Sequence, residues 1–147
     1  MIDLAHATVV VDRALAEGRR LGLPPLTAAV LDGSGCLVSF KREDGASLLR
    51  PEIAQAKAWG ALGMGMGSRA LAQRAAVQPA FISAVNALAG GRLIPVPGGV
   101  LIRSSGKSII GAVGITGATS DQDEACAVAG IEAAGFSADT GADPGAK

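Results

Sequence analysis

Residues 26–42 have the sequence LTAAVLDGSGCLVSFKR, which predicts a β-hairpin. Two largely apolar segments, Leu26–Asp32 and Cys36–Arg42, flank Gly33-Ser34-Gly35, a composition typical of a tight turn. In the second segment apolar and polar residues largely alternate, as expected of a strand with one buried face. This stretch therefore predicts two adjacent antiparallel strands.

A second hairpin is predicted at residues 100–116, VLIRSSGKSIIGAVGIT, with Ser105-Gly106 at its turn. The segment before it, Leu93–Gly99, is apolar, contains two prolines and two glycines, and predicts a turn-rich strand. Because two hairpins occur without a strand–helix–strand unit, the sheet is expected to be antiparallel.

Helical spacing of apolar residues predicts helices before, between and after the hairpins. The expected ranges are Asp3–Leu21, Arg50 to about Met66, Ser68–Ala76, Gln78–Leu88 and Ser120–Ala134. In the first helix the core stripe is expected to comprise Leu4, Thr8, Val11, Leu15 and Gly18. The last helix starts with a capping-box pattern and is rich in alanine, so it can approach a neighbour closely. The predicted fold class is α+β, a central antiparallel sheet of about five strands flanked by helices.

The 147 residues correspond in length to one domain, expected over residues 1–136, with a flexible tail over 137–147. The 13 basic and 13 acidic residues cancel, and the aromatic residues are three phenylalanines and one tryptophan. This composition argues against nucleic acid and membrane surfaces as partners. The sequence shows neither a secretory signal nor a transmembrane segment, so a cytoplasmic location is expected.

His6 is the only histidine, which excludes a multi-histidine zinc site within one chain. As the only imidazole, it is also the only nitrogen ligand of that type for a haem iron. Cys36 and Cys126 lack C-x-x-C spacing, and both are expected to be small buried side chains in a reducing compartment.

Lys57 lies on the predicted apolar stripe of its helix and is the only charged residue between Glu52 and Arg69. Three interpretations are open. The side chain extends to solvent at the helix edge, or it pairs with Asp44 or Glu43 at a pocket that binds an anion, or it has a lowered pKa and transfers protons.

Two glycine-rich segments are candidate anion sites. Gly63, Gly65 and Gly67 lack the Gly-Lys-Ser/Thr ending of a P-loop and follow a helix, so nucleotide binding there is not expected. Gly98-Gly99, after Pro95-Val96-Pro97, makes either a chain reversal or a pair of backbone N–H groups that face an anionic ligand.

Several motifs, in order and at matching spacing, resemble the GlcG/HbpS-type family of small haem-associated proteins, which includes the C-terminal domain of PduO-type proteins. The resemblance extends from Asp3 to about Gly135. Its motifs are Ala28-Ala29-Val30-Leu31-Asp32-Gly33-x-Gly35, Phe40-x-Arg42-x-Asp44-Gly45-Ala46, Ile53-Ala54-x-x-Lys57-Ala58, Pro95-Val96-Pro97-Gly98-Gly99-Val100, Ile110-Gly111-Ala112-Val113-Gly114-Ile115-x-Gly117 and Asp121-x-x-Glu124-Ala125.

The resemblance implies a profilin-like fold, a homo-oligomer (dimer or higher) and a function in haem binding, haem degradation or iron handling under redox stress. It also implies that Asp44, Lys57, Gly98 and Gly99 line one ligand pocket. The haem-iron ligand of the family is not carried by these motifs, so His6 is assigned to the iron only as the available imidazole.

Two further functions are open. One is a small enzyme for an anionic hydroxy- or keto-acid, with Lys57 binding the carboxylate, Asp44 positioning Lys57 or acting as the base, and Gly98 and Gly99 holding an oxyanion. The other is a non-catalytic accessory subunit. An apolar, nearly uncharged segment from Ile53 to Gly67 and the alanine-rich last helix also predict self-association.

Overall fold

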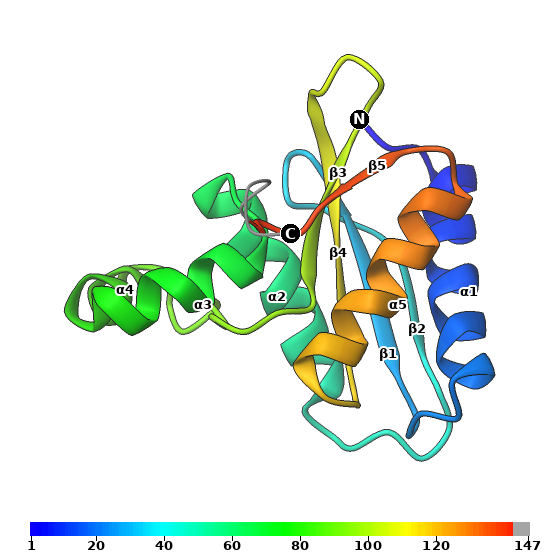
Figure 1. The fold of residues 1–147 in the computed structure, drawn as a ribbon, viewed down its shortest axis with the longest axis horizontal. Helices are drawn as coiled ribbons and strands as arrows, with labels where there is room; N and C mark the ends of the chain where they lie inside the picture. The colour runs from blue at the N-terminus through cyan, green and yellow to red at the C-terminus, as the bar shows by residue number, and fades with distance from the viewer. Residues whose placement is uncertain (143–147) are drawn as a thin grey trace.

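The computed structural model describes residues 1–142 and contains one five-stranded sheet in the order β2-β1-β4-β3-β5 (Figure 1). Every neighbouring pair of strands is antiparallel, which confirms the predicted α+β class. The strands are β1 (Thr27–Asp32), β2 (Leu37–Arg42), β3 (Gly99–Arg103), β4 (Ile109–Thr116) and β5 (Ser137–Asp139).

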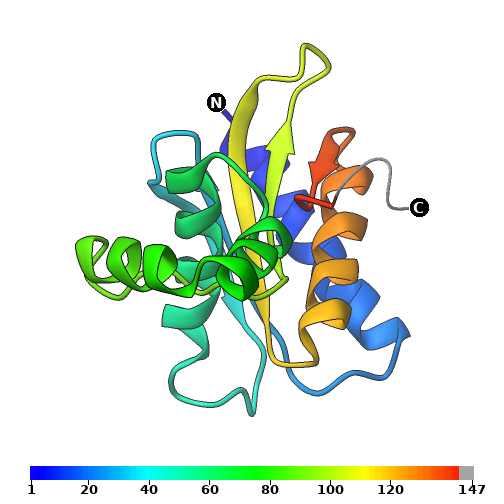
Figure 2. The same ribbon diagram turned by 60° about the vertical axis from the view of Figure 1, so that its left-hand side comes forward.

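Helices cover both faces of this sheet. They are α1 (Leu4–Arg20), α2 (Arg50–Met64), α3 (Ser68–Val77), α4 (Pro79–Leu88) and α5 (Ser120–Ala133). The pair α1 and α5 lies on one face and α2 on the other, while α3 and α4 extend away from the sheet beyond α2 (Figures 1 and 2). None of the helices among the described residues is both long and apolar enough to cross a membrane.

The strands divide their side chains between two apolar cores because successive residues point to opposite faces. Val30 and Val113 face the larger core, which α1 and α5 complete. Leu31, Leu101 and Ala112 belong to the smaller core under α2. Both faces are therefore buried, which explains why β1 and β4 are apolar along most of their length.

Glycines allow the backbone of α2 to lie directly on the sheet. A Cβ atom on Gly114 would overlap the carbonyl oxygen of Ala54, and one on Gly99 would overlap that of Lys57. These two sheet positions therefore require a residue without a side chain. The helix contributes small residues to the same contact, including the fully buried Ala54 and Ala58.

The structure confirms Val11 and Gly18 in the buried stripe of α1 and corrects Leu4. Ala7, Val10 and Ala14 are fully buried, whereas Leu4 is 62% exposed. A Cβ on Gly130 of α5 would overlap the carbonyl oxygen of Val10, so the two helices are in close contact. Only short side chains fit at such a contact, and the longer side chain of Leu4 lies at the surface.

Two predicted boundaries are also wrong. Residues 93–98 lie outside any strand, and β3 starts only at Gly99, because Pro95 and Pro97 have no N–H group for a strand ladder. The expected tail begins with an edge strand, β5, which pairs with β3, and Asp139 makes an ion pair with Arg103 at 2.8 Å. Residues 143–147 of the expected tail lie outside the described residues.

The cysteines occupy different environments. Cys126 is buried in the core, and burial raises the pKa of its thiol to about 11. Cys36 is exposed at the β1–β2 turn, so the expectation that both are buried is wrong for this residue. Neither cysteine forms a disulfide.

Candidate functional site

Lys57 is buried and paired with Asp123. Its ammonium donates hydrogen bonds to Asp123 Oδ2 at 3.1 Å and to the carbonyl oxygen of Ile115 at 2.9 Å. The side chains of Lys57 and Asp123 are only 3% and 2% exposed. Burial lowers the pKa of Lys57, and this effect outweighs the opposing effect of the Asp123 charge. The interpretation that Lys57 extends to solvent is therefore wrong.

The ion pair connects helices on opposite faces of the sheet. Lys57 comes from α2, and Asp123 lies in the first turn of α5, where its Oδ1 also accepts the N–H of Ala118. Gly98, with φ of 121°, makes the passage possible because a Cβ there would lie 2.8 Å from Lys57 Nζ and from the Ile115 carbonyl oxygen. Gly98 is thus required for the Lys57–Asp123 contact.

Gly99 also packs against Lys57, and its backbone N–H has a partner inside the protein. Its N–H donates to Ser68 Oγ at 2.7 Å, and Ser68 is fully buried at the start of α3. Because this N–H already has a buried partner, it is not free to hold an oxyanion. The predicted group of Lys57, Gly98 and Gly99 is therefore brought together, but as a packed junction.

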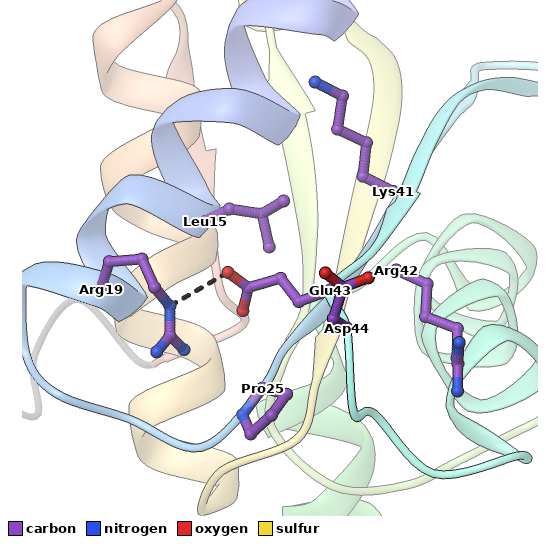
Figure 3. Close-up of a pocket in the computed structure, with 7 residues that line it drawn as sticks. All are labelled: Leu15, Arg19, Pro25, Lys41, Arg42, Glu43 and Asp44. Carbon is purple, nitrogen blue, oxygen red and sulfur yellow. Dashed lines mark ion pairs between the residues drawn. The ribbon is translucent and has the colours of Figure 1, made fainter.

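Asp44 does not belong to this junction, so the predicted Lys57–Asp44 ion pair is wrong. Asp44 follows β2 and lines an open hollow of about 520 Å³ (Figure 3). Glu43 also lines this hollow. It pairs with Arg19 at 3.0 Å and accepts the N–H of Leu26 at 2.7 Å. Lys57 pairs instead with Asp123, with 3.1 Å between Nζ and Oδ2.

The basic side chains of the hollow do not converge on Asp44. In Figure 3 Lys41 and Arg42 point in different directions, away from the Arg19–Glu43 pair. Lys41 pairs instead with Asp12 of α1 at 2.7 Å, and Arg42 donates to the carbonyl oxygen of Ala46. The contacts give no support to an acid–base pair of Lys57 and Asp44 for an organic-acid enzyme.

His6 lies in the first turn of α1, on the other face of the sheet from α2. Its Nδ1 lies 2.7 Å from Asp3 Oδ1, and Asp3 also caps the helix by accepting the backbone N–H of His6. The ring is half-exposed and stands 5.2 Å from the ring of Phe136, centroid to centroid. With Nδ1 engaged by a carboxylate, Nε2 is the free nitrogen, an arrangement common in metal-binding histidines.

Three residues that matter for these contacts were not found from the sequence. Asp123 and Ser68 hold Lys57 and Gly99, and Arg69 of α3 contacts Asp121 at 2.5 Å and Glu124 at 3.0 Å. These two carboxylates raise the pKa of Arg69. Three carboxylates, those of Asp121, Asp123 and Glu124, lie in the first turns of α5, but their positions in the sequence do not show which of them pairs with Lys57.

The fold and these contacts define a small α+β protein with a buried lysine–aspartate pair between its helix layers. The sequence matches the family model for haem-degrading HbpS-like proteins over residues 2–132. The chain belongs to the HbpS-like family, and this membership gives it a haem-related function. None of the curated proteins matches the sequence.

Solved structures share the fold over nearly the whole chain. The haem complex of PduOC is 23% identical, with a TM-score of 0.83 over 92% of this chain and 96% of that one. The Klebsiella pneumoniae protein ORFY is 25% identical, with a TM-score of 0.81 over 91% and 90%. HbpS is 26% identical, with a TM-score of 0.77 over 89% and 88%.

Proposed function

We propose that this chain is a cytoplasmic haem-binding protein of the HbpS type that takes part in haem or iron handling or in the response to redox stress. Membership of the haem-degrading HbpS-like family over residues 2–132 carries this proposal. The haem complex of PduOC, which has the same fold, supports it.

His6 is the residue that we assign to the haem iron. A ligating histidine usually donates its second ring N–H to a carboxylate or carbonyl, which fixes the tautomer and the orientation of the ring. Asp3 supplies that carboxylate, and hydrogen bonding to His6 lowers the pKa of Asp3, so Asp3 stays ionised. His6 and Asp3 would therefore be able to hold a haem iron through the imidazole at the α1 surface.

Haem, when bound, would supply a redox-active iron. The part of this chain would be to place an imidazole nitrogen at that iron and to orient the ring. Asp3 contributes by accepting a hydrogen bond from Nδ1, and the Phe136 ring restricts the imidazole from the side. Because His6 is half-exposed, the imidazole that would hold the iron lies at the surface of the domain.

Titration of the apo-protein with hemin tests this assignment through the Soret band. We expect a sharp, saturable shift in the wild type that is lost in His6→Ala. Asp3→Asn should retain the shift with binding weakened roughly 10- to 100-fold, the usual effect of losing such a supporting partner. An unchanged Soret band in His6→Ala would remove His6 from the site.

Matched variants separate His6 from the other soft ligands of the chain. Cys36→Ser changes an exposed thiol, and Met64→Leu changes a partly buried thioether on the opposite face of the sheet. Both should leave the hemin spectrum as in the wild type. Loss of the Soret shift in either variant would instead identify that residue as the iron ligand.

Self-association as a homo-oligomer, a dimer or larger, is part of the same proposal. The surface that supports it differs from the one expected, because the alanine-rich α5 is already covered by α1. Helix α4 contains no charged residue, yet only Ile82 is buried in it, while Phe81 is 46% and Leu88 90% exposed. A helix this apolar is normally covered on more of its surface. A single species of 14.5 kDa in light scattering at low micromolar concentration would contradict the proposal.

A further inference from the structure

A hollow lies between α2 and the β1–β2 hairpin, on the face of the sheet that α2 covers. One face of α2 forms its first wall, because Glu52, Gln55 and Trp59 follow one another at helical spacing. The hairpin contributes the apolar side chains of Leu31 and Leu37. This Trp59 hollow has a volume of about 290 Å³. Such a volume is at the lower end of the range for small-molecule sites, so a ligand here would be small.

Arg92, from the turn after α4, also lines the Trp59 hollow and is held in one orientation. Its guanidinium stacks on Trp59 at 3.8 Å from the ring centroid. The carbonyl oxygen of Ala89 accepts both the backbone N–H of Arg92 at 3.4 Å and its Nε at 3.3 Å. Among residues 1–142, no carboxylate oxygen lies within 4.0 Å of this guanidinium. Arg92 is thus an exposed, oriented cation without an anionic partner in the described chain.

Glu52 gives the same hollow an unpaired negative charge. It lies two helical turns before Trp59 on α2, and its side chain is exposed. Within the described residues Glu52 makes no ion pair with any lysine, arginine or histidine. Glu52 and Arg92 therefore line one small hollow with opposite charges, yet their charged atoms stay more than 4.0 Å apart while Arg92 is stacked on Trp59.

This pair of separated charges makes the Trp59 hollow selective for the charge of its ligand. A molecule with a carboxylate alone would be attracted by Arg92 and repelled by Glu52, and one with an ammonium alone would meet the reverse. A zwitterion can place each of its charges next to the side chain of opposite sign. The indole of Trp59 and the side chain of Leu37 offer apolar surface to the rest of such a molecule.

We propose that the Trp59 hollow binds a small zwitterionic amino acid with an apolar body. The ligand carboxylate would accept hydrogen bonds from Arg92, because a guanidinium can donate two parallel N–H groups to a carboxylate. The ligand ammonium would donate to Glu52, and the apolar body would lie against Trp59. The site uses none of the exposed α4 side chains that we assign to self-association, and His6 lies on the other face of the sheet.

Calorimetric titration of the full chain with L-leucine and with 6-aminohexanoate, which differ in the spacing of their charges, tests the proposal. We expect saturable binding of at least one of them, with a shift in the emission of Trp59, the only tryptophan. The analogues that lack the ammonium (4-methylpentanoate, hexanoate) or the carboxylate (3-methylbutylamine, pentylamine) should bind at least about tenfold more weakly, since each loses a charge-assisted hydrogen bond. Binding of neither amino acid, binding equal to that of the analogues, or binding without a change in Trp59 emission would overturn the proposal.

Substitutions at the two charged residues should change the preference for these ligands in opposite directions. Arg92→Met should weaken binding of the amino acid about tenfold or more and should bind the amine analogue as well as the amino acid. Glu52→Gln should weaken binding of the amino acid similarly, yet bind the carboxylate analogue at least as well as the wild type, because the repelling charge is gone. Loss of affinity without this exchange of preference would overturn the proposal.

Arg13→Met and Glu132→Gln are the matched controls. Arg13 on α1 and Glu132 on α5 are exposed on the opposite face of the sheet, and the two variants remove the same charges as Arg92→Met and Glu52→Gln. Both should bind the amino acid as the wild type does. A loss as large as that in Arg92→Met or Glu52→Gln would show a general charge effect and overturn the proposal. The His6→Ala variant should also bind normally, so failure of the haem assignment and failure of this site are distinguishable.

Discussion

Lys57 of α2 and Asp123 of α5 meet through a gap that Gly98 leaves at the end of the sheet, with 3.1 Å between Nζ and Oδ2. The contact joins the helix layers of the two faces. Taking two charges out of water is costly, so each ion of such a pair depends on the other for compensation. The junction therefore fixes where α5 starts relative to α2.

Removing one partner of the Lys57–Asp123 pair should lower the free energy of unfolding more than removing both partners. We expect Asp123→Asn to lower the free energy of unfolding by about 3–5 kcal/mol, because it leaves a buried ammonium without its counter-charge. Adding Lys57→Met should recover part of this loss. Urea unfolding of both single variants and the double variant at neutral pH measures the coupling, and a value below about 0.5 kcal/mol would contradict a buried pair.

Asp44→Asn is the matched control for that cycle. Asp44 is exposed in the hollow beside Pro25 and has no contact with Lys57. Its loss should change the free energy of unfolding by less than about 0.5 kcal/mol. A coupling of Lys57 to Asp44 as large as that to Asp123 would mean that the pairing is assigned to the wrong carboxylate.

The free energy of unfolding should depend on pH through the lowered pKa of Lys57. Burial lowers its pKa below the usual 10.5, so the unfolded chain holds more protons than the folded chain between the lowered pKa and 10.5. Stability contributed by this group therefore rises with pH in that interval. We expect the wild type to gain stability relative to the Lys57→Met, Asp123→Asn double variant as the pH is raised toward 10.5, measured by urea unfolding. A constant difference would contradict the lowered pKa.

Substitution by alanine should destabilise the protein at Gly114 and stabilise it at Gly63. Gly114→Ala places a Cβ against the Ala54 carbonyl oxygen, and overpacking of this kind costs roughly 1–3 kcal/mol. Gly63→Ala meets open space within a helix and should stabilise the protein by about 0.5–1 kcal/mol. Thermal unfolding of both variants checks the pair of values. Equal effects would mean that α2 does not lie on the sheet as described.

Ser68→Ala should leave the buried N–H of Gly99 without an acceptor. An unsatisfied buried donor costs roughly 1–3 kcal/mol, and urea unfolding at neutral pH measures that loss. Ser105→Ala, at an exposed turn position, is the control and should change stability by less than about 0.5 kcal/mol. Similar values for the two variants would show that the Ser68–Gly99 hydrogen bond does not contribute.

The candidate site was predictable only in part. The position of Lys57 on an apolar stripe left both an exposed and a buried ammonium open, and the structure shows it buried. The family resemblance grouped Lys57 with Gly98 and Gly99, and these three residues are in close contact. The partner was predicted wrongly because Asp44 is closer in sequence, whereas Asp123 is 66 residues away and is brought in by α5. A carboxylate in the first turn of a helix has no local signal that distinguishes an ion-pair partner from a capping residue.

The sequence by itself determined both hairpins, the three helices between them, the capping box of α5 and membership of the family, because each depends on local spacing or on ordered motifs. Tertiary structure alone decided the edge strand β5, the use of Ala7 and Ala14 in place of Leu4 at the α1–α5 contact, and the pairing of Lys57 with Asp123. These features depend on which distant segments meet and how closely their backbones approach. That distance is set by glycines such as Gly98, Gly99 and Gly114, whose effect appears only when the opposing helix is in place.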